Sequence, residues 1–298
     1  MAILKKLQAA RDSQSSHWVG DGFPVRNMFS YNDIAKYISP YLMMDYAGPH
    51  VFTPTQKRRG VGTHPHRGFE TVTIVYEGQV EHRDSAGGGG VIQKGDVQWM
   101  TAASGLVHEE FHGKEFSASG GLFEMVQLWV NLPKKFKMTK PRYQGILSQQ
   151  IPNISIADGQ GNLRLISGEF QKQTGAAKTF SPIDLWDLQI KADTEVSLPM
   201  KIGHTAMLFI LEGEVSLPEQ SEHFSNAQLL IFDTEGDTLN FKVHKNSKLL
   251  FMGGEPLNEP MIGYGPFVMT TKEEIVQAFQ DFENGLMGKM DSIEGSDH

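Results

Sequence analysis

Short apolar segments of strand length recur along this chain and constrain its fold more than any other feature. They are rich in β-branched or aromatic residues and are bounded by Gly, Pro, Asp or Asn. The clearest of them are Thr71–Tyr76, Leu122–Val130, Leu185–Ile190, Met207–Leu211, Leu229–Phe232 and Lys248–Met252. Many short strands separated by turn residues are typical of a β-sandwich or a β-barrel. We therefore predict an all-β fold.

A short helix is predicted near the end of the chain. Thr271 and Glu274 have the spacing of a capping box, in which each side chain satisfies a backbone amide of the other residue. Apolar residues then recur at helical spacing, at Ile275, Ala278, Phe279, Phe282 and Leu286. We expect this helix to cover about residues 271–286.

An internal echo indicates that one β-domain occurs twice. Ile74–Val80 and Phe209–Val215 both run from a β-rich segment into Glu-Gly-x-Val, which predicts a strand, a tight turn and another strand. Between the copies, Pro, Gly and polar residues interrupt the strand pattern from Lys134 to Ile151. We therefore place an N-terminal domain at residues 1–140 and a C-terminal domain, which includes the helix, at residues 141–298.

Composition excludes several classes of function. The 298 residues include no cysteine, which excludes disulfide scaffolds, thiolate zinc sites and cysteine nucleophiles. The formal net charge is −8, so we expect no direct binding of nucleic acid. No apolar run approaches the ~20 residues of a membrane-spanning helix, and the N-terminus does not resemble a signal peptide. We expect a cytoplasmic protein that does not bind membranes.

The segment from Thr63 to Glu70 carries the first chemical signal. His64, His66 and Glu70 share one parity, so in a strand their side chains point to the same face. Two imidazoles two residues apart on a stiff strand can reach one metal ion, and neutral imidazole suits Fe, Ni, Cu, Zn or Mn. A chain with 11 histidines also contains such pairs by chance, so the pair needs support from elsewhere.

A second segment supplies that support. His108, Glu110 and His112 again share parity, and Gly105 allows a sharp turn just before them. If the two segments are neighbouring strands, three histidines and one carboxylate converge and leave one or two coordination positions open. Open positions are typical of a reactive non-haem site rather than a closed structural one. The spacing leaves open whether Glu70, Glu110 or His112 completes the site.

Longer motifs extend this pattern over nearly the whole chain. They are Val19–Phe23, Ser39–Asp45, His64–Val72, Gly95–Ala102, Gln127–Leu132, Gly254–Pro260 and Gly265–Met269. Together they resemble the pirin family of the cupin superfamily. The resemblance implies a bicupin, with two tandem cupin β-barrels (double-stranded β-helices), and a metal in the first barrel only. An alignment of the two copies of the echo also favours a metal in the first barrel only. In it, Pro199, Lys201 and Thr205 take the positions of His64, His66 and Glu70.

The same resemblance implies a ligand set and a metal. The ligands would be His64, His66, His108 and Glu110, and the metal would be Fe(II), with Mn, Ni, Cu, Co or Zn as alternatives. Glu70, the usual cupin carboxylate, would then take a supporting role. Either Glu110 or Glu70 would accept a proton during catalysis.

The resemblance also implies functions of different classes. The first is an oxidoreductase similar to quercetin 2,3-dioxygenase, which cleaves a flavonoid or another small aromatic substrate with O₂. The second is an iron-dependent, redox-sensitive protein that binds a protein partner, such as a transcription cofactor, without turnover. A third is another cupin reaction, such as isomerisation or decarboxylation of a small acid. We rank the dioxygenase first because this acidic chain has no clear nuclear signal.

Overall fold

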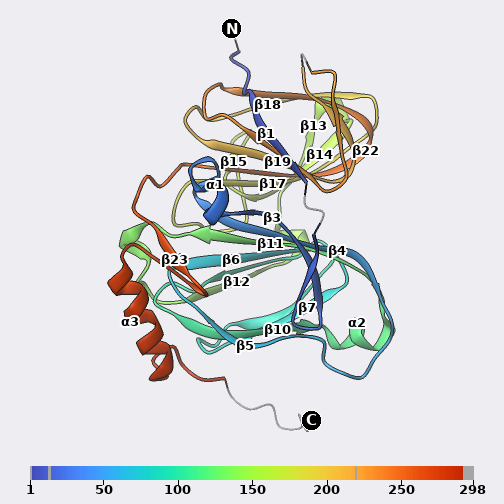
Figure 1. Ribbon diagram of the computed structural model, residues 1–298. Helices are drawn as coiled ribbons and strands as arrows, with labels where there is room; N and C mark the ends of the chain where they lie inside the picture. The colour runs from blue at the N-terminus through green and yellow to red at the C-terminus, as the bar shows by residue number, and fades with distance from the viewer. Residues whose placement is uncertain (1, 13–14, 219, 291–298) are drawn as a thin grey trace. The chain divides into compact units, whose positions relative to one another are not determined.

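The computed structural model describes residues 2–12, 15–218 and 220–290, and most of them lie in β-strands (Figure 1). The chain divides into two compact units, each assembled from separate segments. Unit 1 comprises Met1–Ser15, Asn27–Met44 and Gln149–Asn258. Unit 2 comprises Ser16–Arg26, Asp45–Ser148 and Glu259–His298.

Unit 2 is built on two sheets. The first, called here the β5 sheet, has the order β5 (Gly60–His66), β10 (Leu106–His112), β7 (Gln79–Asp84) and β8 (Gly89–Gln93). The second, called the β6 sheet, has the order β12 (Arg142–Ile146), β9 (Val97–Thr101), β6 (Phe69–Glu77), β11 (Gly121–Asn131), β4 (Tyr41–Phe52), β3 (Phe23–Ser30) and β2 (His17–Val19). Buried side chains from both sheets share one core, for example Val80 and Ile92 with Val75 and Met125. The sheets therefore face each other, as in a cupin barrel.

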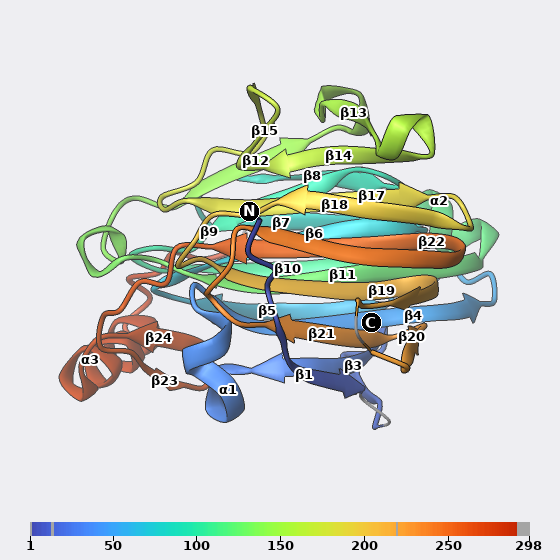
Figure 2. The same cartoon turned by 90° about the horizontal axis from the view of Figure 1, so that it is seen from above.

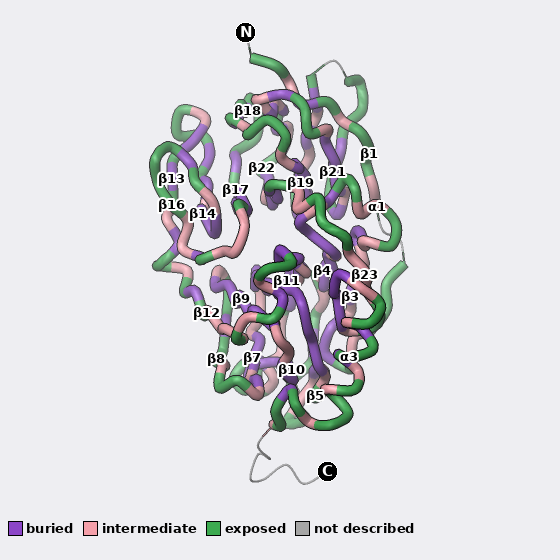
Figure 3. Tube along the Cα trace, turned by 90° about the vertical axis from the view of Figure 1, so that its left-hand side faces the viewer, coloured by how far each residue is buried: buried purple, intermediate pink, exposed green. Residues whose placement is uncertain are grey.

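Unit 1 has a sheet and an apolar core of its own. The sheet order is β1 (Leu7–Asp12), β21 (Gln228–Phe232), β19 (Thr205–Ser216), β22 (Thr238–Gly254), β17 (Ile183–Ile190), β14 (Gly161–Ser167) and β13 (Asn153–Ile156). In addition, β18 (Thr194–Pro199) pairs with β22 and β20 (His223–Ser225) pairs with β19. Figure 2 shows β22 between β19 and β17. The apolar core of unit 1 includes Trp186, Leu208 and Phe251. Buried stretches follow the strands in both units (Figure 3).

The remaining elements are short. The helices are α1 (Tyr31–Ile38), α2 (Lys114–Ser119) and α3 (Lys272–Glu283), with 3₁₀ turns η1 (Lys134–Phe136), η2 (Ser148–Gln150) and η3 (Ala157–Gly159). Two small ladders are β15 (Glu169–Phe170) with β16 (Gln173–Thr174), and β23 (Ile262–Tyr264) with β24 (Phe267–Met269). None of the helices in the described ranges is long and apolar enough to span a bilayer.

The predicted C-terminal helix is present as α3, and its capping box is confirmed. Thr271 Oγ1 accepts a hydrogen bond from the Glu274 amide (3.2 Å), and Glu274 Oε2 accepts one from the Thr271 amide (3.1 Å). The helix ends at Glu283, earlier than residue 286, just before Asn284 and Gly285, and Gly285 has a φ of +72°. Its buried residues Ile275 and Ala278 pack in one cluster with Val107 of β10.

The unit boundaries differ from the predicted division at residues 140 and 141. Residues 142–146, expected in an interrupted join, form β12, which pairs with β9 at the edge of the β6 sheet. The helix α3 also belongs to unit 2, not to the unit that holds residues 149–258. Both differences have the same cause, because both segments pack on the barrel of unit 2. Strand β12 extends the β6 sheet through β9, and α3 covers apolar side chains beside β10.

The two copies of the echo fold differently at their glycines. Gly78 (φ +89°) separates β6 from β7, as the strand–turn–strand prediction requires. Gly213 (φ +107°) lies inside β19, which continues to Ser216 with shifts of register around it. The long strand β22 pairs with β19 on both sides of Gly213 and therefore holds the second copy as one bulged strand.

Candidate metal centre

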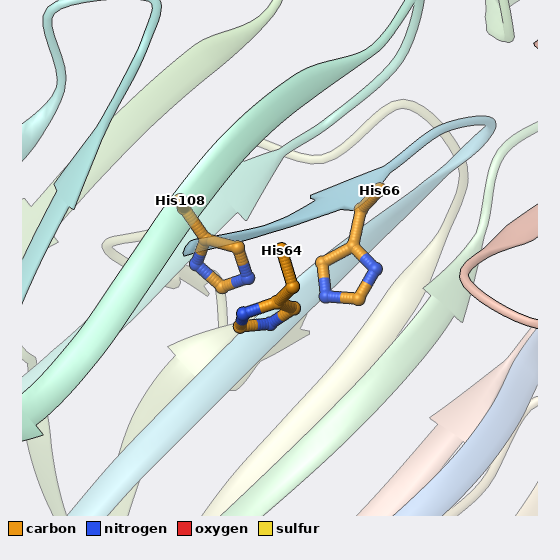
Figure 4. Close-up of side chains that lie close together, drawn as sticks. All are labelled: His64, His66 and His108. Atoms are coloured by element: carbon orange, nitrogen blue, oxygen red, sulfur yellow. The ribbon is translucent and has the colours of Figure 1, made fainter. Parts of the chain in front are cut away.

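Three imidazoles converge from two adjacent strands of unit 2. Strand β10 pairs antiparallel with β5, and His108 lies directly opposite His64. His66 lies two residues further along β5, so it shares the face of His64. One ring nitrogen from each of the three lies within 4.8 Å of the others. Figure 4 shows the three rings gathered at one point.

The hydrogen bonds of these rings leave one nitrogen on each of them available to bind a metal ion. Nδ1 of His64 lies 2.8 Å from the Gly62 carbonyl oxygen, and Nδ1 of His66 lies 3.4 Å from that of Pro266. A carbonyl can only accept, so both Nδ1 atoms carry the proton and both Nε2 atoms keep a lone pair. His108 Nε2 is buried and, within the described residues, has no hydrogen-bond partner. A buried, unpartnered ring nitrogen beside two available ones fits a metal ion.

Burial keeps the rings of His66 and His108 neutral. Burial, and to a smaller extent the neighbouring His64, lower the pKa of His66 to about 3. The pKa of His108 is well below the ordinary histidine value, because the ring is buried and lies beside His66 and His64. Neutral imidazole is the form that binds metal ions.

Glu110 belongs to a second group of close side chains in the described part of the chain, with His82 and His108. Its carboxylate accepts hydrogen bonds from Gln98 Nε2 (3.1 Å) and Gln127 Nε2 (3.0 Å), which come from the facing β6 sheet. The structure therefore places Glu110 beside His108, while His64 and His66 lie in the first group only.

The other two residues that the spacing left open belong to neither group. Glu70 is 1% exposed on β6 and accepts a 2.7 Å hydrogen bond from Thr101 Oγ1. Burial raises the pKa of this carboxyl to about 7. His112 is held by the Gly22 carbonyl oxygen, 2.8 Å from Nε2, and its ring packs against Phe52. Of the three alternatives, only Glu110 lies in a group with a member of the histidine cluster.

Sequence reasoning missed the residues behind His108. His82 belongs to neither of the two histidine segments that the sequence singles out, yet it is 1% exposed. His82 Nε2 lies 3.1 Å from Asp84 Oδ2, and its Nδ1 lies 3.3 Å from His108 Nδ1. The shared parity of His82 and Asp84 was a usable signal. The pairing of β7 with β10, which turns both residues toward the cluster, has no counterpart in the local sequence.

Asp84 is held as a carboxylate. Burial by itself would raise its pKa, but hydrogen bonds from His82 and from the backbone amides of Gly88 and Ala86 outweigh burial. The pKa of Asp84 is therefore below its ordinary value. Both amides donate to Oδ1, at 2.8 Å from Ala86 and 2.9 Å from Gly88, which leaves Oδ2 for His82.

Comparison with known proteins identifies the family. Residues 22–130 match the Pirin model, and residues 185–288 match the model of the Pirin C-terminal cupin domain. The chain belongs to the pirin family. These matches confirm the family predicted from the motifs and the all-β fold of two cupin domains with a short C-terminal helix.

Two known proteins match this chain over almost their full length. A Pseudomonas aeruginosa protein named "Putative quercetin 2,3-dioxygenase" is 52% identical over 282 residues, which are 95% of this chain and 98% of that protein. The crystal structure of a quercetin 2,3-dioxygenase from Acinetobacter baumannii is 49% identical, with a TM-score of 0.93, and the match covers 96% of this chain and 99% of that one.

A more distant pirin shares the fold and has been solved with a metal. The Escherichia coli protein YhhW, in complex with nickel(II), is 20% identical with a TM-score of 0.63. The match covers 83% of this chain and 99% of that chain. At this identity the likeness shows the fold alone.

Proposed function

We propose that this pirin is a metal-dependent dioxygenase that cleaves flavonols such as quercetin with O₂ at a mononuclear non-haem iron site. The observation that carries the proposal is the convergence of His64, His66 and His108, with His108 Nε2 buried and unpartnered within the described residues. The names of the two close relatives support the choice of a flavonol as substrate.

The proposed ligands are His64, His66, His108 and Glu110. The geometry supports Glu110 as the carboxylate, because it lies two residues from His108 on the same face of β10 and the ligand atoms of the two residues lie within 4.8 Å of each other. Bound Fe(II) would supply a Lewis-acidic open position and the redox capacity to activate O₂. Mn, Ni, Cu, Co or Zn also accept this set of imidazole and carboxylate donors.

Two carboxyl groups of the chain are proposed to handle protons. With a pKa of about 7, Glu70 can take up or release a proton near neutral pH, as a general base must. Glu110 is ordered by the amides of Gln98 and Gln127, so it can accept a proton at a defined position. Either group would serve to deprotonate the flavonol 3-hydroxyl.

The test is turnover by protein of known metal content. Anaerobically purified, iron-loaded protein should consume quercetin and O₂ and release carbon monoxide, and His64→Ala should abolish this by removing a ligand. His17→Ala, which replaces an exposed histidine of β2, is the matched control and should keep full activity. If fully loaded protein consumed neither flavonol nor O₂, the iron-dependent interaction protein would replace the dioxygenase as the proposed function.

A further inference from the structure

We propose that Asp84 and His82 form a buried positioning pair that fixes the tautomer of His108 and so presents its Nε2 lone pair to the metal. The inference rests on the proposed metal site and deepens it. It assigns a role to two side chains that bind neither substrate nor metal.

Strand register brings the pair to His108. In the antiparallel pairing of β7 with β10, Asp84 lies opposite His108 and His82 lies opposite Glu110. All four residues share one face of the β5 sheet, and their side chains are buried. A line of hydrogen bonds runs from Asp84 Oδ2 to His82 Nε2 (3.1 Å) and from His82 Nδ1 to His108 Nδ1 (3.3 Å).

The proton positions along this line follow from its ends. Asp84 Oδ2 can only accept, so His82 carries a proton on Nε2, and in the neutral ring its Nδ1 is then the acceptor. His108 Nδ1 must then donate to His82, which leaves the lone pair of His108 on Nε2. That is the buried nitrogen without a partner in the described residues, and it belongs to the cluster with His64 and His66.

Gln98 supports the same assignment independently. Its Nε2 donates to Glu110 Oε1 (3.1 Å), and because a carboxylate only accepts, the orientation of the amide is fixed. The same Nε2 lies 3.3 Å from His82 Nδ1. The Gln98 amide nitrogen that faces His82 Nδ1 is therefore a donor, as it must be if this nitrogen has no proton.

The alternative is that His82 binds the metal itself, together with His108 and Glu110. That arrangement would break its hydrogen bond with Asp84 or with His108, because both ring nitrogens are committed. Tyr143 also stacks on the ring of His82, with centroids 5.1 Å apart and planes 13° from parallel, and so opposes rotation. The geometry favours positioning over ligation.

Asp84→Asn tests the tautomer directly. Oδ1 accepts two backbone amides, so the asparagine must keep its oxygen there and turn its NH₂ group toward His82. His82 Nε2 would then accept, its Nδ1 would carry the proton, and the proton of His108 would move to Nε2. In metal-free protein, ¹⁵N correlation spectra of the histidine rings should show His108 protonated on Nδ1 in the wild type and on Nε2 in the variant.

Metal affinity provides the second readout. We expect Asp84→Asn and His82→Phe each to weaken Ni²⁺ binding about 10- to 100-fold, the range for loss of a group that orients a ligand. His82→Phe keeps a ring against Tyr143 and removes the nitrogens. The double variant should bind no more weakly than His82→Phe alone, because Asp84 acts through His82. Glu81→Gln, on the same strand, is the control and should bind as the wild type does.

The outcomes separate this inference from the proposed function. Wild-type His108 protonated on Nε2, or additive losses of affinity in the double variant, would overturn the positioning role whatever the protein catalyses. An unchanged tautomer in Asp84→Asn would do the same. The expected spectra and affinities would stand even if quercetin were not consumed, because neither readout involves turnover. Unfolding of the metal-free variants identifies any general loss of structure.

Discussion

Arg67 Nη1 lies 2.7 Å from Asp281 Oδ2, and this ion pair joins the residue after His66 to the C-terminal helix. Arg67 is 4% exposed, and its Nε also donates to the Ser104 carbonyl oxygen (2.7 Å). The Pro266 carbonyl oxygen, in the turn before β24, accepts from the backbone amide of Arg67 and from His66 Nδ1. The C-terminal segment of unit 2 therefore holds one of the three converging histidines.

We expect Asp281→Ala to destabilise this attachment. The variant leaves a buried guanidinium without its counter-charge, and the partial exposure of Asp281 limits the loss to about 2 kcal/mol in the free energy of unfolding. Hydrogen exchange should rise in α3 and in β5. Glu283→Ala, an exposed change on the same helix, should leave both unchanged. Equal effects of the two variants would show that the ion pair does not hold the helix.

Lys137 gives a second prediction about the support of the same barrel. Its Nζ donates to the Gly68 and Val268 carbonyl oxygens (2.7 and 2.9 Å) and to Asn131 Oδ1 (2.6 Å). Lys137→Met would leave these three acceptors unsatisfied, and we expect a loss of about 2–4 kcal/mol in the free energy of unfolding. Lys135→Met, two residues earlier and exposed, should cost less than about 0.5 kcal/mol. Denaturant unfolding of both variants measures the difference, and similar midpoints would contradict it.

Lys137 also shows where sequence reasoning fails. The motif Lys134-Lys135-Phe136-Lys137 predicts a solvated basic surface, yet Lys137 is 2% exposed. Its burial depends on two carbonyl oxygens far apart in sequence, at positions 68 and 268, and no local pattern places them together. His82 is the same case, because its burial depends on the pairing of β7 with β10.

The features that could be predicted are those encoded by spacing along one strand. Alternation places His64 and His66 on one face, and apolar runs bounded by turn residues mark β6, β11, β17, β19, β21 and β22. Spacing along a strand does not distinguish Glu110 from Glu70 as the ligand, because each carboxylate shares the parity of the histidines in its own segment. The amides of Gln98 and Gln127, which bind Glu110, lie in other strands. The preference for Glu110 therefore comes from the family resemblance.

The buried carboxyl of Glu70 predicts a pH dependence of stability. Its pKa is raised from 4.5 to about 7, so between these values the folded chain keeps a proton that the unfolded chain releases. The contribution of Glu70 to the free energy of unfolding is largest below pH 4.5 and is lost as the pH rises toward 7. The difference in unfolding free energy between metal-free wild type and Glu70→Gln should therefore fall by about 3 kcal/mol over this window.

Thr101→Val provides the matched variant for that measurement. The hydrogen bond from Thr101 lowers the pKa of Glu70, so its loss should move the upper end of the window to higher pH. A difference between wild type and Glu70→Gln that stays flat from pH 4.5 to 7 would show that Glu70 is not held protonated by burial.

The last prediction separates the two carboxylates in metal binding. Glu110→Gln replaces a charged oxygen donor beside His108 with a neutral amide, so metal retention should fall sharply. Glu70 lies on β6, whereas His66 ends β5 in the other sheet. The carboxyl group of Glu70 accepts a hydrogen bond from Thr101 and joins neither group of close ligand atoms in the described residues. Glu70→Gln should therefore reduce metal content less, by disturbing groups around the ligands. The measurement is metal stoichiometry after dialysis of both variants against a weak chelator, with unfolding of each metal-free variant as the control for folding. Metal lost from Glu70→Gln but kept by Glu110→Gln would make Glu70 the ligand, as in the general cupin pattern.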